Sequence, residues 1–373
     1  MENTKWNFRK IHETRCNYIV KYNQNIEDKE YCDFLEHSIV SHYLMGNLTN
    51  HELDFINKYK LNSYIKKIPF DIEEISQKYS DSYKHSNDEN YYKDAHFLLN
   101  TFSNKPNDLP MFEDCIFMPE DHIEITRKFY NELNNPIISY HANKILNYPN
   151  VINFTSSQNP RYKNFWGSTL YDIIDNKAYI NCQSSNTSAD LIVLPHEIIH
   201  AVDFEIKAKF YKQHVQGYQE VPTYFIDYLF LDFLKKENYN EIEIEKLKHH
   251  KQVYIINLAK STLYEVNRKI KRTTEKDINN MSSDEINKVY DPYICKQVSE
   301  LESCLVSSIM YKKYQHDPEE TMSMLNQFLK NGIQKNGGSI LEIFNLTYQD
   351  LIIEAENINQ GSYTNIQEPI KQR

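Results

Sequence analysis

Apolar residues recur at three- and four-residue spacing along most of this chain, which places them on one face of a helix. The pattern is visible early in the chain, over 31–40 and 71–75. A helical pair is predicted over 118–146, with a break at Asn134-Asn135-Pro136. Further helices are predicted over 189–212, 220–237, 243–272, 283–314, 317–331 and 338–345.

The pattern changes between the helical pair and the helix that begins near residue 189. Short runs with strand character occupy 151–154, 168–174 and 178–182, and a polar turn at 175–177 separates the last two. These runs predict a small β-sheet directly before the next helix. The expected fold class is therefore mainly α, with a small sheet beside one helix.

Polar breaks suggest how the chain is divided. The clearest is the Ser-Asn-Lys-Pro-Asn run at 103–107, which is a plausible hinge. We therefore predict an N-terminal helical lobe over 1–110 and a main region over 111–355. Residues 356–373 are polar and rich in asparagine and glutamine, and they are expected to form a tail.

Composition narrows the classes of partner. The chain has 373 residues and a formal net charge of −10, so its surface repels phosphate groups, and neither nucleic acid nor anionic membrane is expected to bind. Only 7 glycines are present, which disfavours phosphate-binding loops and tightly turned β folds. No apolar run approaches the length of a membrane span, and the first residues lack a signal-peptide core, so a cytoplasmic location is expected. The oligomeric state cannot be read from the sequence.

The most specific chemical signal is the run His196-Glu197-Ile198-Ile199-His200. Two histidines four residues apart project from one face of a helix, one turn apart, so their nitrogens can reach a single metal ion at about 2.0–2.1 Å. Glu197 lies about 100° further round the helix, where its carboxylate can reach a water on that metal. The alternative is that the two histidines only pack at helical spacing and bind no metal.

A catalytic zinc ion usually has three protein ligands and one open position. The metzincin extension would require glycine and histidine where this chain has Asp203 and Ile206, so that subclass is excluded. Glu220 is the favoured third ligand because Pro222 suits the first turn of a helix that Glu220 would open. Glu205 lies on the same helix as the histidines and points away from them. The remaining rivals fall in a charged stretch and are Glu237, Glu241, Glu243 and Glu245.

Several motifs follow one another between residues 167 and 230. They are Ile180-Asn181, Thr187-Ser188-Ala189-Asp190-Leu191, Leu194-Pro195 before the HEIIH run with Ala201 after it, and Glu220-Val221-Pro222-Thr223 followed by Asp227. In this order they resemble the thimet oligopeptidase and oligoendopeptidase F family of zinc peptidases. The run 291–297 and the segment 328–351 are also similar to the C-terminal helices of that family. The resemblance covers about 160 to 352.

The resemblance implies a fold with two helical lobes flanking a deep cleft, in a shortened form. It implies one Zn²⁺ per chain, bound by His196, His200 and Glu220, and it makes Glu197 the general base. The chain departs from the family in having Ile199 where glycine is usual. It also has no histidine between 251 and 315, where the family places one that stabilises the oxyanion.

Other side chains are expected to assist the site. Tyr293, or else Tyr290, is the expected oxyanion donor in place of the missing histidine. Asp227 lies two turns after Glu220 on the same side of the helix, where it could orient a histidine. Asp203, one turn after His200, is similarly placed.

These observations predict a zinc metallopeptidase of the HExxH gluzincin type, which hydrolyses short peptides. Two alternatives stay open. One is a toxin-like zinc endopeptidase that cuts a specific protein, and the other is a non-catalytic relative that binds peptides. The sequence indicates neither the preferred bond nor whether the enzyme matures one dedicated peptide.

Overall fold

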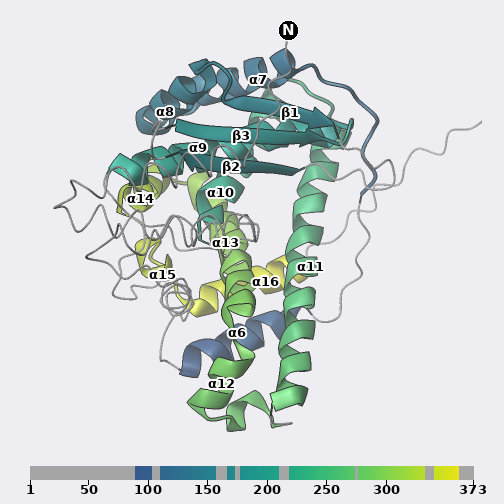
Figure 1. The fold of residues 1–373 in the computed structure, drawn as a ribbon, viewed down its shortest axis with the longest axis vertical. Helices are drawn as coiled ribbons and strands as arrows, with labels where there is room; N and C mark the ends of the chain where they lie inside the picture. Colours follow the sequence, from purple (N-terminus) through teal and green to yellow (C-terminus); the bar gives the residue numbers. More distant parts are fainter. Residues whose placement is uncertain are drawn as a thin grey trace, which may run out of the picture.

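The computed structural model describes residues 89–102, 110–156, 166–172, 177–209, 218–273, 276–331 and 340–360. This part of the chain is mainly helical, with one three-stranded sheet (Figure 1). The mainly α class and the small sheet beside the HEIIH helix are confirmed. The predicted lobe over 1–110 lies mostly outside the described residues, so the division into two lobes around a cleft stays a prediction.

The elements follow one another in this order: α6 (Glu89–Thr101), α7 (Pro119–Glu132), α8 (Pro136–Asn147), β1 (Ile152–Ser156), β2 (Trp166–Asp172), β3 (Lys177–Ser184), the 3₁₀-helix η1 (Ser188–Ile192), α9 (Val193–Lys209), α10 (Glu220–Lys236), α11 (Glu241–Thr273), the 3₁₀-helix η2 (Ile278–Asn280), α12 (Ser283–Val289), α13 (Pro292–Tyr314), α14 (Pro318–Asn331), α15 (Ile340–Ile343) and α16 (Tyr348–Gln360).

The sheet has the strand order β1-β3-β2. β2 and β3 are antiparallel, and Gly167 lies opposite Cys182. β1 pairs with the other edge of β3 in the parallel direction, with Ile152 opposite Ile180. The HEIIH helix α9 packs against β2 and β3, so the sheet supports one side of that helix.

The predicted break in the first helical pair is confirmed. Asn135 ends the connection between α7 and α8, and its side-chain oxygen accepts a hydrogen bond from the backbone N–H of Ile138 at 3.2 Å. Pro136 occupies the first helical position, where its missing N–H costs nothing. An asparagine cap followed by proline is therefore enough to place this helix start.

The helix predicted over 283–314 is instead two helices, α12 and α13. The break lies at Asp291-Pro292. A residue before proline is restricted from helical geometry, and proline has no N–H to continue the helix. Asp291 then caps α13 by accepting a hydrogen bond from the N–H of Ile294 at 3.0 Å. At the other end of the chain, α16 runs to Gln360, five residues into the segment predicted as a tail.

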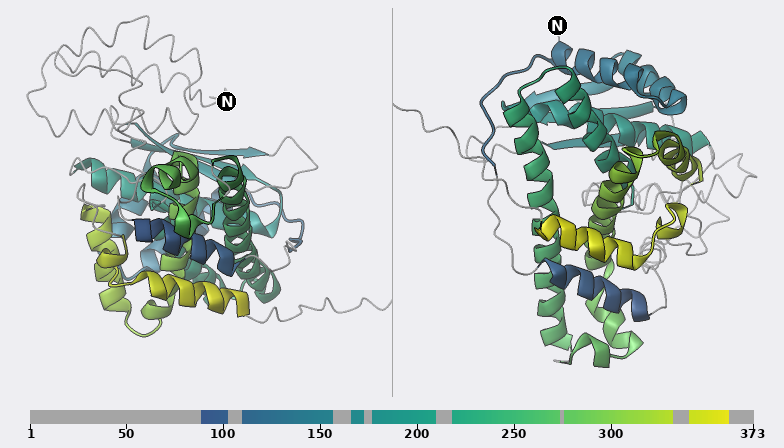
Figure 2. Two further views of the ribbon diagram at one scale, coloured as in Figure 1. Left: turned by 90° about the horizontal axis from the view of Figure 1, so that it is seen from below. Right: turned by 180° about the vertical axis from the view of Figure 1, so that it is seen from behind.

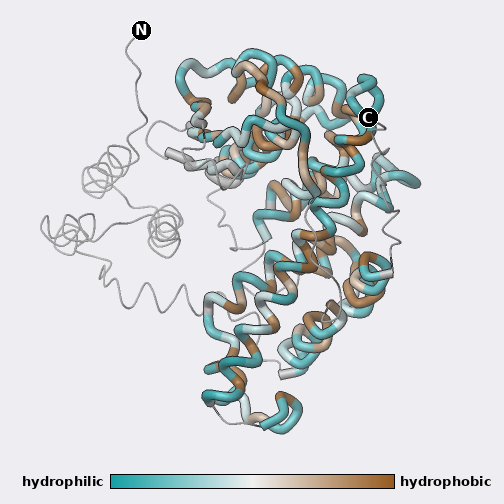
Figure 3. Tube along the Cα trace, turned by 90° about the vertical axis from the view of Figure 1, so that its right-hand side faces the viewer, coloured by the Kyte–Doolittle hydropathy of each residue, from teal (hydrophilic) through white to brown (hydrophobic). Residues whose placement is uncertain are grey.

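The long helix α11 connects the two ends of the molecule. Its 33 residues extend about 50 Å at 1.5 Å per residue. α6 packs against α11 and α16, and α13 packs against α10, α11, α14 and α16 (Figures 1 and 2). Apolar and polar stretches alternate along these helices, as expected when each buries one face (Figure 3). None of the helices in the described ranges has the length and apolar content that a membrane crossing requires.

Candidate active site

Helix α9 presents the two histidines from a firmly packed support. Ile198, Ile199 and Val202 have no exposed surface and fill the space between α9 and its neighbours. The hydroxyl of Tyr130 on α7 donates a hydrogen bond to the carbonyl oxygen of Pro195 at 2.7 Å, which fixes the turn just before His196. Ile199, at the position where glycine is usual in the resembling family, is thus part of the core.

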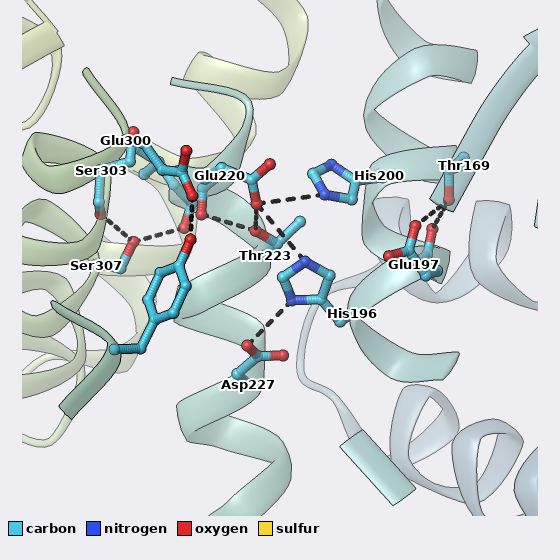
Figure 4. Close-up of polar contacts among 12 residues, drawn as sticks. Thr169, His196, Glu197, His200, Glu220, Thr223, Asp227, Glu300, Ser303 and Ser307 are labelled. Atoms are coloured by element: carbon cyan, nitrogen blue, oxygen red, sulfur yellow. Dashed lines mark hydrogen bonds and ion pairs between the residues drawn. The ribbon is translucent and has the colours of Figure 1, made fainter. Parts of the chain in front are cut away.

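The structure brings His196, His200 and Glu220 together, as the sequence predicts. One ligand atom from each lies within 4.8 Å of the other two. The Oε2 atom of Glu220 is 3.6 Å from Nε2 of His196 and 3.4 Å from Nε2 of His200 (Figure 4). Glu220 opens α10, as predicted, and the Thr223 hydroxyl donates to the same Oε2 atom at 3.0 Å.

These separations suit a shared metal ion. Two ligand atoms at 2.0–2.2 Å from a tetrahedral metal ion are about 3.4 Å apart. The Glu220 oxygen is 3.6 Å from the His196 nitrogen and 3.4 Å from the His200 nitrogen, which is close to that separation. Two imidazoles and one carboxylate are also a donor set that zinc uses in catalytic sites. The chain therefore holds three groups that fit a metal ion and leave a fourth position for water.

A carboxylate on α10 orients the first histidine. Oδ2 of Asp227 lies 3.1 Å from Nδ1 of His196, which leaves Nε2 of the same ring facing Glu220. Burial acts to lower the pKa of His196, but the carboxylates of Asp227, Glu220 and Glu197 together outweigh it, and the pKa is raised well above its ordinary value. The prediction that Asp227 contacts a histidine is confirmed. Asp203, the other predicted candidate, is fully buried on α9.

Lys251 on α11 is a partner of this site that the sequence did not indicate. Its ammonium pairs with Oδ2 of Asp227, the same atom that contacts His196. The ammonium also lies 4.8 Å from the ring centre of Tyr224 and 5.5 Å from that of Tyr228. Asp227 and Lys251 are only 4% and 10% exposed, so the pair is shielded from solvent. This pair ties α11 to the histidine through Asp227.

Replacing Asp227 with asparagine is expected to weaken metal binding by about 10- to 100-fold, the usual effect of losing a carboxylate that orients a histidine ligand. The zinc dissociation constant, from competition with a chelating indicator, measures this effect. Asp232→Asn is a matched control on the same helix, because Asp232 binds Tyr311 and Gln315 instead. Equal zinc affinity in both variants would show that Asp227 does not support the site.

Glu197 lies on the side of α9 that faces β2 (Figure 4). Its Oε2 atom accepts a hydrogen bond from the Thr169 hydroxyl at 2.6 Å, and the same hydroxyl contacts the Glu197 carbonyl oxygen at 3.0 Å. The residue is 5% exposed, and burial raises the pKa of its carboxyl group. Gly167 on β2 leaves room for this side chain, because a Cβ atom there would lie 2.4 Å from Cγ of Glu197.

Gly167→Ala is therefore expected to displace Glu197 while sparing the metal ligands. A shift of about 1 Å in a reacting group can lower kcat/KM about 100-fold. Peptidase assays and zinc content, measured on one preparation, test this prediction. Ser168→Ala is the control, because neighbouring side chains on a strand point to opposite faces. Full activity in Gly167→Ala would contradict the expectation that Glu197 must keep this position.

The expected role of Tyr290 and Tyr293 as oxyanion donors stays a prediction, because neither has a contact with His196, His200 or Glu220 among those found in the described residues. Tyr290 is buried against Tyr92, with ring centres 4.9 Å apart, and Tyr293 is 59% exposed. Both belong to the junction of α12 and α13, at the opposite end of α11 from the sheet and α9 (Figure 1). The break at Asp291-Pro292 lies between these two tyrosines, so Tyr290 follows the end of α12 and Tyr293 lies in the first turn of α13.

Other tyrosines stand beside the histidines instead. The ring of Tyr224 on α10 is 5.8 Å from that of His196, and the ring of Tyr254 on α11 is 6.1 Å from that of Tyr224. The Tyr254 hydroxyl donates to Glu300 on α13. Glu300 lies beside Glu220 (Figure 4), and burial together with the negative charge of Glu220 raises the pKa of Glu300. Tyr224 follows Glu220 by four residues on α10, so both side chains project from the same face of that helix. This spacing could have predicted from the sequence that Tyr224 lies near the site.

The rival carboxylates for the third ligand position have other partners. Glu205 contacts His141 at 2.9 Å and Lys144 at 3.1 Å. Glu237 pairs with Lys128, and Glu243 accepts hydrogen bonds from Lys246 and Ser188. Glu241 and Glu245 form ion pairs with lysines at the surface. Among the described residues, the group that can hold a metal ion is His196, His200 and Glu220.

No family model and no curated protein matches this chain. Three solved structures are similar to it. An oligoendopeptidase F from Bacillus anthracis str. Ames shares 15% identity over 66% of this chain, with a TM-score of 0.49. PZ peptidase A, solved with an inhibitor, shares 10% identity over 95% of this chain, also at 0.49. Another oligoendopeptidase F shares 11% identity over 95%, again at 0.49.

The alignments cover different shares of those three proteins. The matched part spans about half of the Bacillus protein, 47% of its length, and 74% and 75% of the other two. Two of the three are named oligoendopeptidase F. At these identities and TM-scores, the activities of those proteins are not transferred to this chain.

Proposed function

We propose that this protein is a zinc metallopeptidase of the HExxH gluzincin type. The observation that carries the proposal is the convergence of His196, His200 and Glu220, with the Glu220 oxygen 3.6 and 3.4 Å from the two histidine nitrogens. These residues would hold one Zn²⁺ per chain. The presence of a glutamate between the two histidines favours hydrolysis over a purely structural metal site, because a structural site needs no general base.

A zinc ion held by these residues would act as a Lewis acid and lower the pKa of a water molecule towards neutrality. Glu197 accepts a proton from this attacking water and later delivers it to the amine of the leaving peptide. The Thr169 hydroxyl holds the Glu197 carboxylate in place on the side of α9 that faces β2. Asp227 keeps His196 in the orientation that presents Nε2 to the site.

We propose short peptides as the substrates. The motif order that resembles the thimet oligopeptidase and oligoendopeptidase F family supports this choice. Two tyrosines at the site, Tyr224 and Tyr254, add apolar surface with a polar tip, which suits contact with a peptide chain. A toxin-like endopeptidase that cuts one folded protein, and a relative that binds peptides without cleaving them, are the two alternatives.

One assay separates these functions. The purified chain is incubated with a library of short quenched peptides and with casein, each with and without a zinc chelator. Cleavage of short peptides that the chelator abolishes and zinc restores supports the proposal. Cleavage of a protein with no cleavage of short peptides would favour the toxin-like alternative. Stoichiometric zinc without any cleavage would favour the peptide-binding one.

A further inference from the structure

A second carboxylate, Glu302 on α13, lies buried near the start of α10. It is 1% exposed, and its three partners in the described part of the chain are tyrosine hydroxyls. Tyr91 and Tyr348 donate to Oε1 at 3.0 and 2.9 Å, and Tyr218 donates to Oε2 at 2.5 Å. Burial raises the pKa of Glu302, and the three hydroxyls oppose that shift. The carboxylate is thus satisfied by neutral donors alone.

The three tyrosines come from segments that are far apart in the sequence. Tyr91 belongs to α6, Tyr348 begins α16, and Tyr218 lies in the turn just before α10. Burying a carboxylate without a cation is costly, and replacing such a group with apolar residues is often neutral or stabilising. Overall stability is therefore a poor explanation for Glu302. Its hydrogen bonds do fix the relative positions of four segments.

The segment that depends most on this network is the first turn of α10. Gln219, at the N-cap of α10, forms no side-chain capping hydrogen bond. The turn is held by Tyr218, whose carbonyl oxygen accepts from the N–H of Val221 at 3.2 Å. From α13, the Ser307 hydroxyl donates to the Val221 carbonyl oxygen at 2.8 Å. Glu220 stands between these two anchored residues.

We propose that Glu302 and Tyr218 are positioning residues for the metal site. By holding the Tyr218 hydroxyl, Glu302 fixes the start of α10 and sets the Glu220 carboxylate opposite His196 and His200. The inference rests on the proposed zinc site and adds two residues that keep its third ligand, Glu220, in position. The other two tyrosines complete the carboxylate's hydrogen bonds but do not adjoin a ligand.

Tyr218→Phe and Tyr348→Phe form a matched pair, because each removes one hydroxyl from the same buried carboxylate. Both are expected to lower the melting temperature of the zinc-free protein to a similar extent. Only Tyr218→Phe is expected to weaken zinc binding, by about 10-fold in competition with a chelating indicator, while Tyr348→Phe stays within about 2-fold of the wild type. Equal zinc affinity in the two variants would overturn the proposal.

Glu302→Gln provides a second variant if Tyr218→Phe fails to fold. An amide offers one acceptor oxygen where the carboxylate offers two, so at least one hydroxyl loses its acceptor. Glu302→Gln is expected to weaken zinc binding by less than about 10-fold relative to the wild type. A zinc affinity equal to that of the wild type would overturn the proposal. A wild-type protein that binds no zinc would overturn the proposed function itself, whereas a variant that binds zinc as the wild type does would overturn the positioning role alone.

Discussion

Glu197→Gln is expected to lower kcat/KM for peptide cleavage by about 10² to 10⁴-fold, the range that general acid–base catalysis supplies. Glutamine has nearly the same shape as glutamate but cannot accept the proton of the attacking water. Glu197 is not among the three residues whose ligand atoms converge, so the zinc content should stay at one per chain. Steady-state cleavage of a quenched peptide and metal analysis of the same sample check both halves of this prediction.

The control for this variant is Glu245→Gln, since Glu245 is a half-exposed glutamate on α11 that pairs with Lys248 at 3.1 Å. It should leave both activity and zinc content unchanged. Near-normal cleavage by Glu197→Gln would mean that another group takes the proton. Loss of zinc along with activity would mean that Glu197 is needed to bind the metal, and the loss of activity would then not show that it accepts the proton of the water.

The second large effect is expected for Glu220→Ala, which removes the one carboxylate of the three-residue group that, in the described ranges, can hold a metal ion. Only the two imidazoles then remain as ligands. Losing a residue that merely hydrogen-bonds to a ligand weakens metal binding by up to about 100-fold, so the loss of a ligand itself should weaken zinc binding by more than that. Peptidase activity should fall with it and return only in part at high zinc concentration. Titration with zinc against a chelating indicator gives the dissociation constant.

Glu241→Ala is the matched control. Glu241 is an exposed glutamate at the start of α11 that pairs with Lys235 on α10, and the sequence made it one of the rivals for the third ligand position. Its zinc affinity should equal that of the wild type. If Glu220→Ala bound zinc as tightly as the wild type, the third ligand would have to come from elsewhere in the chain.

The sequence predicted the elements that carry the candidate ligands because their signals are local. His196 and His200 are related by helical spacing, and Glu220 precedes a proline at a helix start. Asp227, seven residues after Glu220, follows from the same periodicity. The small sheet was predicted from runs of strand-forming residues. Each of these inferences needs only a few neighbouring residues.

The sequence failed where contacts join distant segments. Lys251 and Asp227 are 24 residues apart, and Tyr91 and Glu302 are 211 residues apart. No local pattern marks such pairs, because either residue alone suits a solvated surface. The single helix predicted over 283–314 failed for a different reason. Pro292 breaks the helix predicted over 283–314 and leaves Tyr293 exposed at the far end of α11, a break that the Asp-Pro pair could have indicated.

The most direct test of the central claim is to measure zinc and peptidase activity together on the purified wild-type chain. Zinc is quantified by mass spectrometry before and after treatment with a chelator, and again after zinc is restored, with peptide cleavage followed at each step. The account predicts one zinc per chain, activity that disappears with the metal, and recovery of both on adding zinc back. A chain that binds no zinc, or one that cleaves peptides equally well without it, would contradict the account.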